Sequence, residues 1–528
     1  MRSDQVLVLP ASFGQERLWL HEQVRHEAPL YNVAGGVRFG GELRLDVLRR
    51  CLSWIVARHE VLRTVFRLEG AQVSQVVRPP YDVDVEIAEV GGDLEETLRE
   101  LAAEPFDLAA GPLFRCHLLR TGPGEQLLFL VMHHIVGDGQ SRDVLLMELG
   151  ELYDAAISER EAHLPDLPVQ YADFAVWQRQ VLESGALDDQ VAYWRDRLEG
   201  APELALPLDR PRPERPRHSM RTAELSVPGD MMSRLRTVGG GLTPFMVALS
   251  GYAALLGRWS AQPSVVVALP AAGRDEPELE NLVGFFVNTL PVRMDLGDDP
   301  TLAELLRRTR DRCLEAFANA AVPFEKLMEE LRPHRTGRRL PFAQAWIVLE
   351  DPPVLGDLFG REVEVVVPGE ARSPFDIALQ VRNDGEALLG TLAGAADVFD
   401  AETVRAAART FAAILAADPA TRVSELPFLI DQTSVVFDTA AGEPGRDSED
   451  AAAATATEHL LAELWSEVLE LDEVSVDDEF YALGGNSLRA VRVMMRAHEL
   501  GMEIPVELVL GEHTVRQLAA GAGSVDED

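Results

Sequence analysis

Two adjacent histidines end an apolar run of strand length, and a glycine-flanked turn follows them directly. The run covers residues 126–131 (QLLFLV), and the histidines are His133 and His134. After the turn Gly137-Asp138-Gly139, apolar residues at helical spacing predict a helix with Ser141 as its N-cap. Because neighbouring strand residues point to opposite faces, the two histidines cannot both serve one small site. One is expected to face the chemistry, and the other to pack or to hold the loop.

Taken alone, such a pair indicates two satisfied core histidines, because short motif matches are weak hypotheses. A metal site is disfavoured, since adjacent histidines splay apart and no Cys/His cluster with ligand spacing accompanies them. The glycines on either side of Asp138 allow unusual backbone angles and close approach of another molecule. What turns the interpretation toward function is the rest of the chain.

The stretch reads HHxxxDG and resembles the active-site motif of nonribosomal peptide synthetase condensation domains. Six further stretches agree with that family in order: residues 12–19 (SFGQERLW), 58–66 (RHEVLRTVF), 171–178 (YADFAVWQ), 283–289 (VGFFVNT) with Arg293, 322–325 (VPFE) and, more loosely, 337–342 (GRRLPF). The resemblance covers residues 9–431. Two positions depart from the family's pattern: Gly137 stands where Ser or Ala is frequent, and Gln140 where Trp is frequent.

The resemblance implies an α/β fold of two chloramphenicol-acetyltransferase-like lobes arranged as a V, at residues 1–180 and 181–431. His134 would lie midway along a tunnel between the lobes, with His133, Asp138 and Gly139 completing the catalytic motif and Gly139 keeping the tunnel open. Asp138 is expected to hold its loop through an arginine. The arginine would be Arg63 or Arg293, and Asn288 and Arg293 would approach from the second lobe. Taken alone, Arg63 reads as a solvated helix-end charge, and Asn288 and Arg293 as strand-end polar groups.

A compositional shift marks the end of this region. Residues 432–455 are rich in Ala, Gly, Asp and Glu and are expected to be a linker. Residues 456–522 predict a small helical bundle, with short helices at 505–510 and 514–520, and residues 523–528 an acidic tail. A Ser at a Gly-Gly turn is usually only an N-cap. Here residues 477–488 (DDEFYALGGNSL) resemble the attachment site of peptidyl carrier domains, which implies a four-helix bundle with 4′-phosphopantetheine on Ser487.

Composition limits the partners. The 528 residues carry a formal net charge of −38, which argues against binding nucleic acid or an anionic membrane. Cys51, Cys116 and Cys313 form no disulfide or ligand pattern, and no apolar run reaches transmembrane length. These features favour a cytoplasmic protein.

The resemblance therefore implies a condensation–carrier didomain of the kind used in antibiotic biosynthesis. It would transfer an acyl or peptidyl thioester from an upstream donor carrier to an amine or hydroxyl acceptor held on Ser487. The linker has no room for an adenylation domain, so loading is expected from a trans-acting adenylation enzyme. A phosphopantetheinyl transferase and a downstream synthetase or thioesterase complete the expected partners.

A cyclising domain is disfavoured, because it would carry Asp for the motif's first His, and epimerising domains follow their carrier. The alternative is a non-catalytic platform that recruits other enzymes to the carrier, although such platforms usually lose the His or the Gly.

Overall fold

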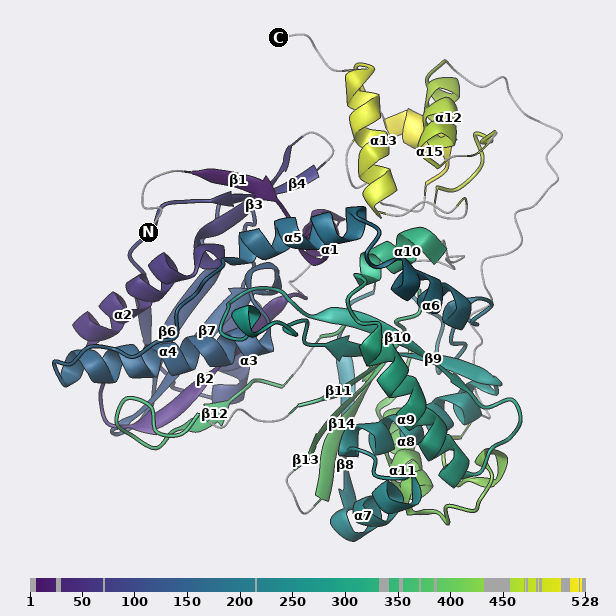
Figure 1. Ribbon diagram of the computed structural model, residues 1–528, viewed down its shortest axis with the longest axis horizontal. Coiled ribbons are helices and arrows are strands. Elements are labelled where there is room, and N and C mark those ends of the chain that lie inside the picture. The colour runs from purple at the N-terminus through teal and green to yellow at the C-terminus, as the bar shows by residue number, and fades with distance from the viewer. Residues whose placement is uncertain are drawn as a thin grey trace.

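The computed structural model describes residues 6–24, 30–69, 72–213, 216–331, 341–350, 355–369, 372–383, 387–431, 456–469, 471, 473–480, 483, 487–504, 513–521 and 523–524. Figure 1 shows two bodies that each contain a sheet, and a small helical body carrying the end of the chain. The expected helix at 505–510 and the linker at 432–455 lie outside the described residues, as do residues 337–340 of the last of the six motif stretches.

A five-stranded sheet forms the centre of the first body, with the strand order β12-β2-β7-β6-β5. Its strands are β2 (Asn32–Gly40), β5 (Val85–Glu89), β6 (Phe114–Gly122), β7 (Glu125–His133) and β12 (Glu364–Val366). Residues 127–132 of strand β7 are all apolar, and both faces of this part of the strand are covered. Leu128, Leu130 and Met132 belong to the core formed with α2 (Leu45–Arg58) and α4 (Gly139–Ile157), while Leu127 and Phe129 pack with α3 (Leu94–Ala102).

Further elements complete the first body and lead to the second. They are a three-stranded sheet of β1 (Leu7–Pro10), β4 (Gln72–Val77) and β3 (Thr64–Glu69), the single-turn helices η1 (Glu60–Arg63) and η2 (His134–Val136), and the helices α1 (Phe13–Val24), α5 (Tyr171–Glu183) and α6 (Asp188–Leu198). Helices α1 and α5 lie below the C-terminal helical body in the view of Figure 1.

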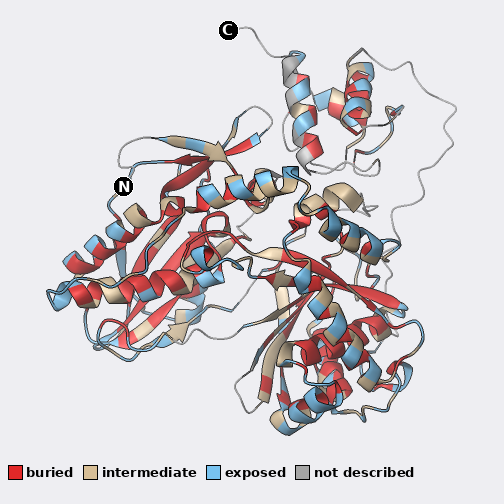
Figure 2. Ribbon diagram, in the orientation of Figure 1, coloured by how far each residue is buried: buried red, intermediate tan, exposed pale blue. Residues whose placement is uncertain are grey.

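The second body is built on a six-stranded sheet with the order β10-β9-β11-β13-β14-β8. The strands are β8 (Met220–Pro228), β9 (Ser264–Ala271), β10 (Asn288–Asp295), β11 (Ala345–Leu349), β13 (Ile377–Asn383) and β14 (Ala387–Ala395). The helices are α7 (Gly229–Val238), α8 (Pro244–Ser260), α9 (Leu302–Ala318), α10 (Phe324–Leu331) and α11 (Ala401–Ala416), with single turns η3 (Pro277–Leu279) and η4 (Val423–Glu425). Helix α8 is almost wholly buried against this sheet (Figure 2), as its apolar composition predicts.

Two stretches of the second half of the chain return to the first body. Strand β12 pairs antiparallel with β2, with Val365 opposite Val37. Phe285, Phe286 and Phe359 are buried in the core of the first body rather than in that of the second. The two bodies are therefore interlocked parts of one structure. The segment that contains Phe285 and Phe286 lies close to His134.

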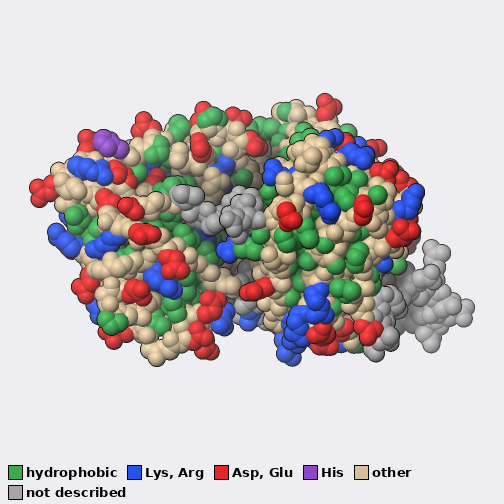
Figure 3. All heavy atoms as spheres, turned by 90° about the horizontal axis from the view of Figure 1, so that it is seen from below, with side chains coloured by type: hydrophobic (Ala, Val, Ile, Leu, Met, Phe, Trp, Pro, Cys, Tyr) green, Lys and Arg blue, Asp and Glu red, His purple; other side chains and the backbone are tan. Residues whose placement is uncertain are grey.

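The C-terminal body contains α12 (Ala456–Leu469), α13 (Ser487–Glu499), α15 (Val515–Gly521) and the short strands β15 (Met502–Glu503) and β16 (Gly523–Ser524). Trp465 and Phe480 meet in its core with ring centroids 4.8 Å apart. Helix α13 contacts α1 of the first body (Figure 1). Among the described helices, none has the length and apolarity needed to cross a membrane. Figure 3 shows acidic and basic side chains interspersed over the face seen from below.

Candidate active site

Strand β7 carries the first histidine, and a single helical turn carries the second. His133 is the last residue of β7 and pairs with Asn32 of β2, while His134 opens η2. The His134 backbone N–H donates to the Tyr31 carbonyl at 2.6 Å, and the Gln15 side-chain amide donates to the Ile135 carbonyl at 3.0 Å. The backbone of the turn is therefore held by two hydrogen bonds, one to the Tyr31 backbone and one from the Gln15 side chain.

The His134 ring has one nitrogen fixed and one available. Its Nδ1 lies 2.8 Å from the Gly137 carbonyl oxygen. Because a carbonyl oxygen only accepts, Nδ1 carries the proton, and Nε2 of the neutral ring keeps a lone pair. Burial lowers the pKa of His134, and this outweighs the opposing effects of the Gly137 carbonyl and Asp138. His134 is thus neutral near pH 7 and able to accept a proton at Nε2.

The His133 ring has the opposite arrangement. It is 1% exposed, and its Nδ1 accepts a hydrogen bond of 3.1 Å from the Ile135 backbone N–H. The proton of the neutral ring is therefore on Nε2. His133 packs inside the protein, whereas the surroundings of His134 leave it partly exposed.

Asp138 is buried and fully engaged. Its carboxylate accepts from both terminal nitrogens of Arg274 at 2.8 Å, from the Ser141 backbone N–H at 2.9 Å and hydroxyl at 2.7 Å, and from the Phe286 backbone N–H at 3.2 Å. Burial alone would raise the pKa of Asp138, but Arg274 and Ser141 more than offset it, so that the pKa lies below its ordinary value. Asp138, rather than Ser141 as predicted, caps α4.

The prediction that Arg63 or Arg293 pairs with Asp138 was wrong. The Arg63 guanidinium donates to the Arg78 carbonyl and lies 3.4 Å from a Glu60 carboxylate oxygen. Arg293 donates to the Ser264 hydroxyl at 3.1 Å and to a backbone carbonyl at 2.8 Å. The loop after β9, which none of the motif stretches covers, supplies Arg274 instead.

Asn288 acts within the second body. Its amide nitrogen donates to the Ala320 and Val322 carbonyls at 2.9 and 2.7 Å, and its oxygen accepts from the Phe324 backbone N–H at 3.0 Å. Asn288 therefore holds the start of α10 against β10. None of these contacts involves Asp138 or His134.

A segment of the second half of the chain clamps the motif loop. The Gly284 N–H donates to the Ser141 hydroxyl at 3.1 Å, and the Tyr171 hydroxyl donates to the Phe285 carbonyl at 2.6 Å. As a result the Phe285 ring meets the His134 ring nearly edge-on, with centroids 4.8 Å apart. Tyr171 and Phe285 lie within the motif stretches, but their sequence positions alone do not predict these contacts.

The two motif glycines differ in their surroundings. Gly137 has φ −172°, and Gly139 also lies outside the left-handed region, so the unusual backbone that glycine allows is absent at both. A Cβ at Gly137 would come within 2.4 Å of the Met132 sulfur, whereas a Cβ at Gly139 would meet no atom within 4 Å. A side chain at position 137 would require Met132 to shift, whereas open space adjoins Gly139.

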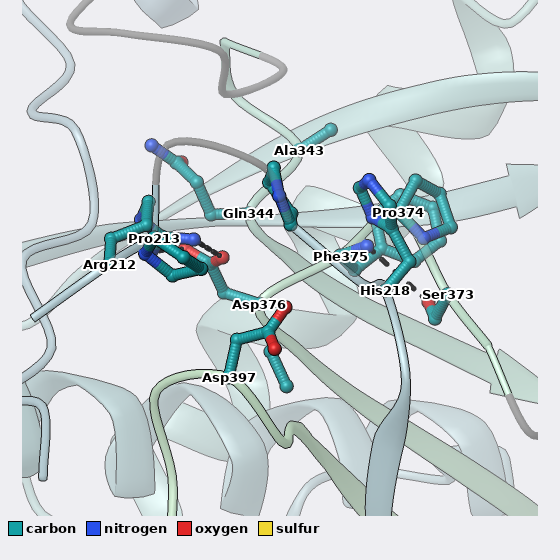
Figure 4. A pocket seen from close by; sticks show the side chains of 12 residues that line it. Arg212, Pro213, His218, Ala343, Gln344, Ser373, Pro374, Phe375, Asp376 and Asp397 are labelled. Atoms are coloured by element: carbon teal, nitrogen blue, oxygen red, sulfur yellow. Dashed lines mark hydrogen bonds and ion pairs between the residues drawn. The ribbon is translucent and has the colours of Figure 1, made fainter. Parts of the chain in front are cut away.

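A separate small cavity lies in the second body (Figure 4). Its volume is about 50 Å³, and Arg212 pairs with Asp376 through two hydrogen bonds of 2.7 and 2.9 Å at its edge. His134 and Asp138 are not among the residues that line it. The described residues contain no cluster of His, Cys, Asp and Glu able to hold a metal ion.

Helix α13 begins at Ser487. The first turn of a helix has backbone N–H groups without intrahelical partners, and these groups suit a phosphodiester. A hydroxyl residue at this position therefore fits a covalently attached 4′-phosphopantetheine.

Comparisons with known proteins agree with this architecture. A family model described as a condensation domain matches residues 6–434, and one described as a phosphopantetheine attachment site matches residues 459–521. A linear gramicidin synthase of Brevibacillus parabrevis is 32% identical over 98% of this chain, and phosphinothricin tripeptide synthetase PhsC of Streptomyces viridochromogenes is 36% identical over 81%. The chain spans only 11% and 41% of these two relatives.

Two solved structures share the fold of the first two bodies. The condensation domain of the monacolin K polyketide synthase MokA superposes with a TM-score of 0.70 at 26% identity, covering 80% of this chain and all of that one. The X-domain in a complex of the X-domain and OxyB from teicoplanin biosynthesis gives 0.72 at 29% identity, covering 80% and 96%. This chain belongs to the condensation-domain family of nonribosomal peptide synthetases, and it continues into a carrier domain that bears 4′-phosphopantetheine.

Proposed function

We propose that the protein is an acyltransferase that forms an amide or ester bond between a donor thioester and an acceptor on its own carrier domain. The observation that carries the proposal is His134 itself. It has a partly exposed, neutral ring whose Nδ1 proton is fixed by the Gly137 carbonyl and whose Nε2 keeps its lone pair.

With an amine acceptor, the reaction requires modest proton transfer. An α-amino group has a pKa of ~7.7–8.0, so a useful fraction is neutral at cellular pH and can attack the donor thioester carbonyl. The C–N bond forms and the C–S bond breaks, while the proton lost by nitrogen passes to His134 Nε2 and then to the departing sulfur. Positioning of the two reactants contributes more to the rate than full deprotonation would.

Asp138 does not take part in this transfer. Five hydrogen bonds occupy its carboxylate, and its role is to hold the loop through Arg274 and Ser141. The open space beside Gly139 adjoins the same loop and suits the passage of substrate past His134.

Ser487 is the residue that we assign as the attachment point on the carrier. When bound there, 4′-phosphopantetheine supplies a thiol that holds an acyl group as a thioester. A trans-acting adenylation enzyme would load this thiol, a phosphopantetheinyl transferase would attach the group, an upstream carrier would present the donor, and a downstream synthetase or thioesterase would take the product.

A platform that recruits other enzymes to the carrier is the second candidate function. It is favoured by one comparison, since the X-domain to which this chain is similar was solved in complex with OxyB. The two functions differ in whether the chain itself forms a bond.

Reconstitution of the transfer reaction distinguishes an acyltransferase from a platform. The purified chain, carrying phosphopantetheine and an aminoacyl group, is mixed with an acyl-loaded donor carrier, and the mass on Ser487 is followed. We expect the acyl mass to move to this chain, and not to move in His134→Ala. A transfer that fails with the wild-type chain across candidate donors, while a partner enzyme binds it, would support the platform.

A further inference from the structure

The last turn of helix α1 lies close to His133 and to the residue that binds the His134 backbone. His21 and Glu22 are consecutive residues of this turn. The His21 Nδ1 lies 2.8 Å from the Tyr31 hydroxyl, and the Tyr31 carbonyl accepts the His134 backbone N–H. Glu22 faces the other histidine, His133. One helical turn therefore contacts His133 through Glu22 and, through His21, the residue whose carbonyl accepts from the His134 backbone.

Glu22 and His133 leave two complementary groups facing each other. A Glu22 carboxylate oxygen lies 3.6 Å from His133 Nε2, and the side chains are 19% and 1% exposed. Both atoms are buried, and neither has a hydrogen-bond partner among the described residues. Because the Ile135 N–H occupies Nδ1, Nε2 carries a proton, and the Glu22 carboxylate oxygen is an acceptor 3.6 Å away from it.

A buried donor and a buried acceptor without partners are each costly. A rotation of the Glu22 side chain, which closes the gap to a charge-assisted hydrogen bond of about 2.7–2.9 Å, would satisfy both at once. The His133 ring would then be held at both nitrogens, by Glu22 at Nε2 and by the Ile135 N–H at Nδ1. Since the turn from His133 to Ile135 contains His134, the ring orientation of His133 fixes the backbone that presents the reacting ring.

We propose that Glu22 is a positioning residue of this active site, acting on His134 through a buried carboxylate–imidazole hydrogen bond to His133. The inference deepens the proposed acyl transfer and rests on it for the effect on turnover. The hydrogen bond itself does not depend on that function. In this proposal, His133 connects helix α1 to the turn η2, and helix α1 supports the ring of His133.

The test uses the full-length chain with three variants. Glu22→Ala removes the acceptor, Glu22→Gln keeps an oxygen that accepts from Nε2–H, and Gln23→Ala changes the next residue of the same turn as a control. The first measurement is NMR of the ¹⁵N-histidine-labelled protein, with the His133 resonances assigned by their loss in His133→Asn. The second is single-turnover acyl transfer.

We expect wild type and Glu22→Gln to show His133 protonated at Nε2, with a downfield proton resonance that exchanges slowly with water. In Glu22→Ala this resonance should move upfield and broaden. Turnover should fall by about 10- to 100-fold, by analogy with the groups that orient metal-binding histidines. Glu22→Gln should recover most of the rate, and Gln23→Ala should match wild type in both measurements.

A His133 proton on Nδ1 in wild type would overturn the inference. So would a resonance or a turnover in Glu22→Ala that matches Gln23→Ala. If the proposed transfer itself is wrong, the wild-type chain will show no turnover, while the His133 resonance still reports on the hydrogen bond. The two failures are therefore distinguishable, and the wild-type spectrum decides the point even if Glu22→Ala does not fold.

Discussion

Removing Arg274 should destabilise the protein far more than removing either arginine that the sequence suggested. In Arg274→Ala the Asp138 carboxylate, 1% exposed, loses two hydrogen bonds of 2.8 Å from a charged donor. Each such bond contributes about 1.5–3 kcal/mol, and breaking a buried ion pair on one side costs about 3–5 kcal/mol. We therefore expect the free energy of unfolding, measured by urea denaturation at pH 7, to fall by about 3–5 kcal/mol.

The control is Arg293→Ala, because Arg293 donates only to two uncharged acceptors and is partly exposed. It should cost about 1 kcal/mol or less. The double variant Asp138→Ala/Arg274→Ala should cost less than the two single changes added together, since no unpaired charge remains. Equal destabilisation by Arg274→Ala and Arg293→Ala would refute the assignment of Arg274.

The Asp138–Arg274 pair also predicts how the stability of the protein changes with pH. The folded pKa of Asp138 is below its unfolded value of ~3.9, so its contribution to stability is present above that value and is lost as the pH falls through the folded pKa. Asp138→Asn cannot titrate and should lose this part of the acid sensitivity. An acid unfolding curve with the same slope in both proteins would contradict the lowered pKa.

Four further predictions concern the two motif glycines, the pKa of His134, the attachment site Ser487 and the loading of the carrier. Gly137→Ala should cost about 1–3 kcal/mol because its Cβ would press on Met132, whereas Gly139→Ala should stay within about 0.5 kcal/mol in the same urea assay. The single-turnover rate should fall as the pH drops through a His134 pKa below ~6.5, and a pH-independent rate would show that another group takes the proton. Intact-mass analysis after treatment with a phosphopantetheinyl transferase and coenzyme A should show one added arm, which Ser487→Ala abolishes. The chain alone should give no amino-acid-dependent ATP–pyrophosphate exchange, and exchange by the purified chain would overturn loading in trans.

Local structure was predictable where one residue pattern determined it. The apolar run before His133 predicted a buried strand, and β7 is covered by α4 on one side and α3 on the other. His133 and His134 differ in their surroundings as expected, but His134 lies in the turn η2 rather than in strand β7, so strand alternation alone does not explain the difference. These features depend only on residues close together in the chain.

The partner of Asp138 could not be predicted, because it lies far away in the sequence. Arg274 lies 136 positions away along the chain, in a loop outside all of the motif stretches. Several arginines could satisfy a buried carboxylate equally well, and only the packing of the segment around Phe286 selects one. The cap of α4 was misassigned because Asp138 and Ser141 are both good N-caps, and the carboxylate accepts from the serine rather than the reverse.

The most direct test of the proposed function is the single-turnover rate of acyl transfer in wild type and His134→Ala, with folding of both checked by circular dichroism. General acid–base groups contribute about 10²–10⁴-fold to a rate. We therefore predict that His134→Ala folds normally and transfers at least about 100-fold more slowly. An unchanged transfer rate in folded His134→Ala would contradict the assignment of this histidine as the group that carries the proton.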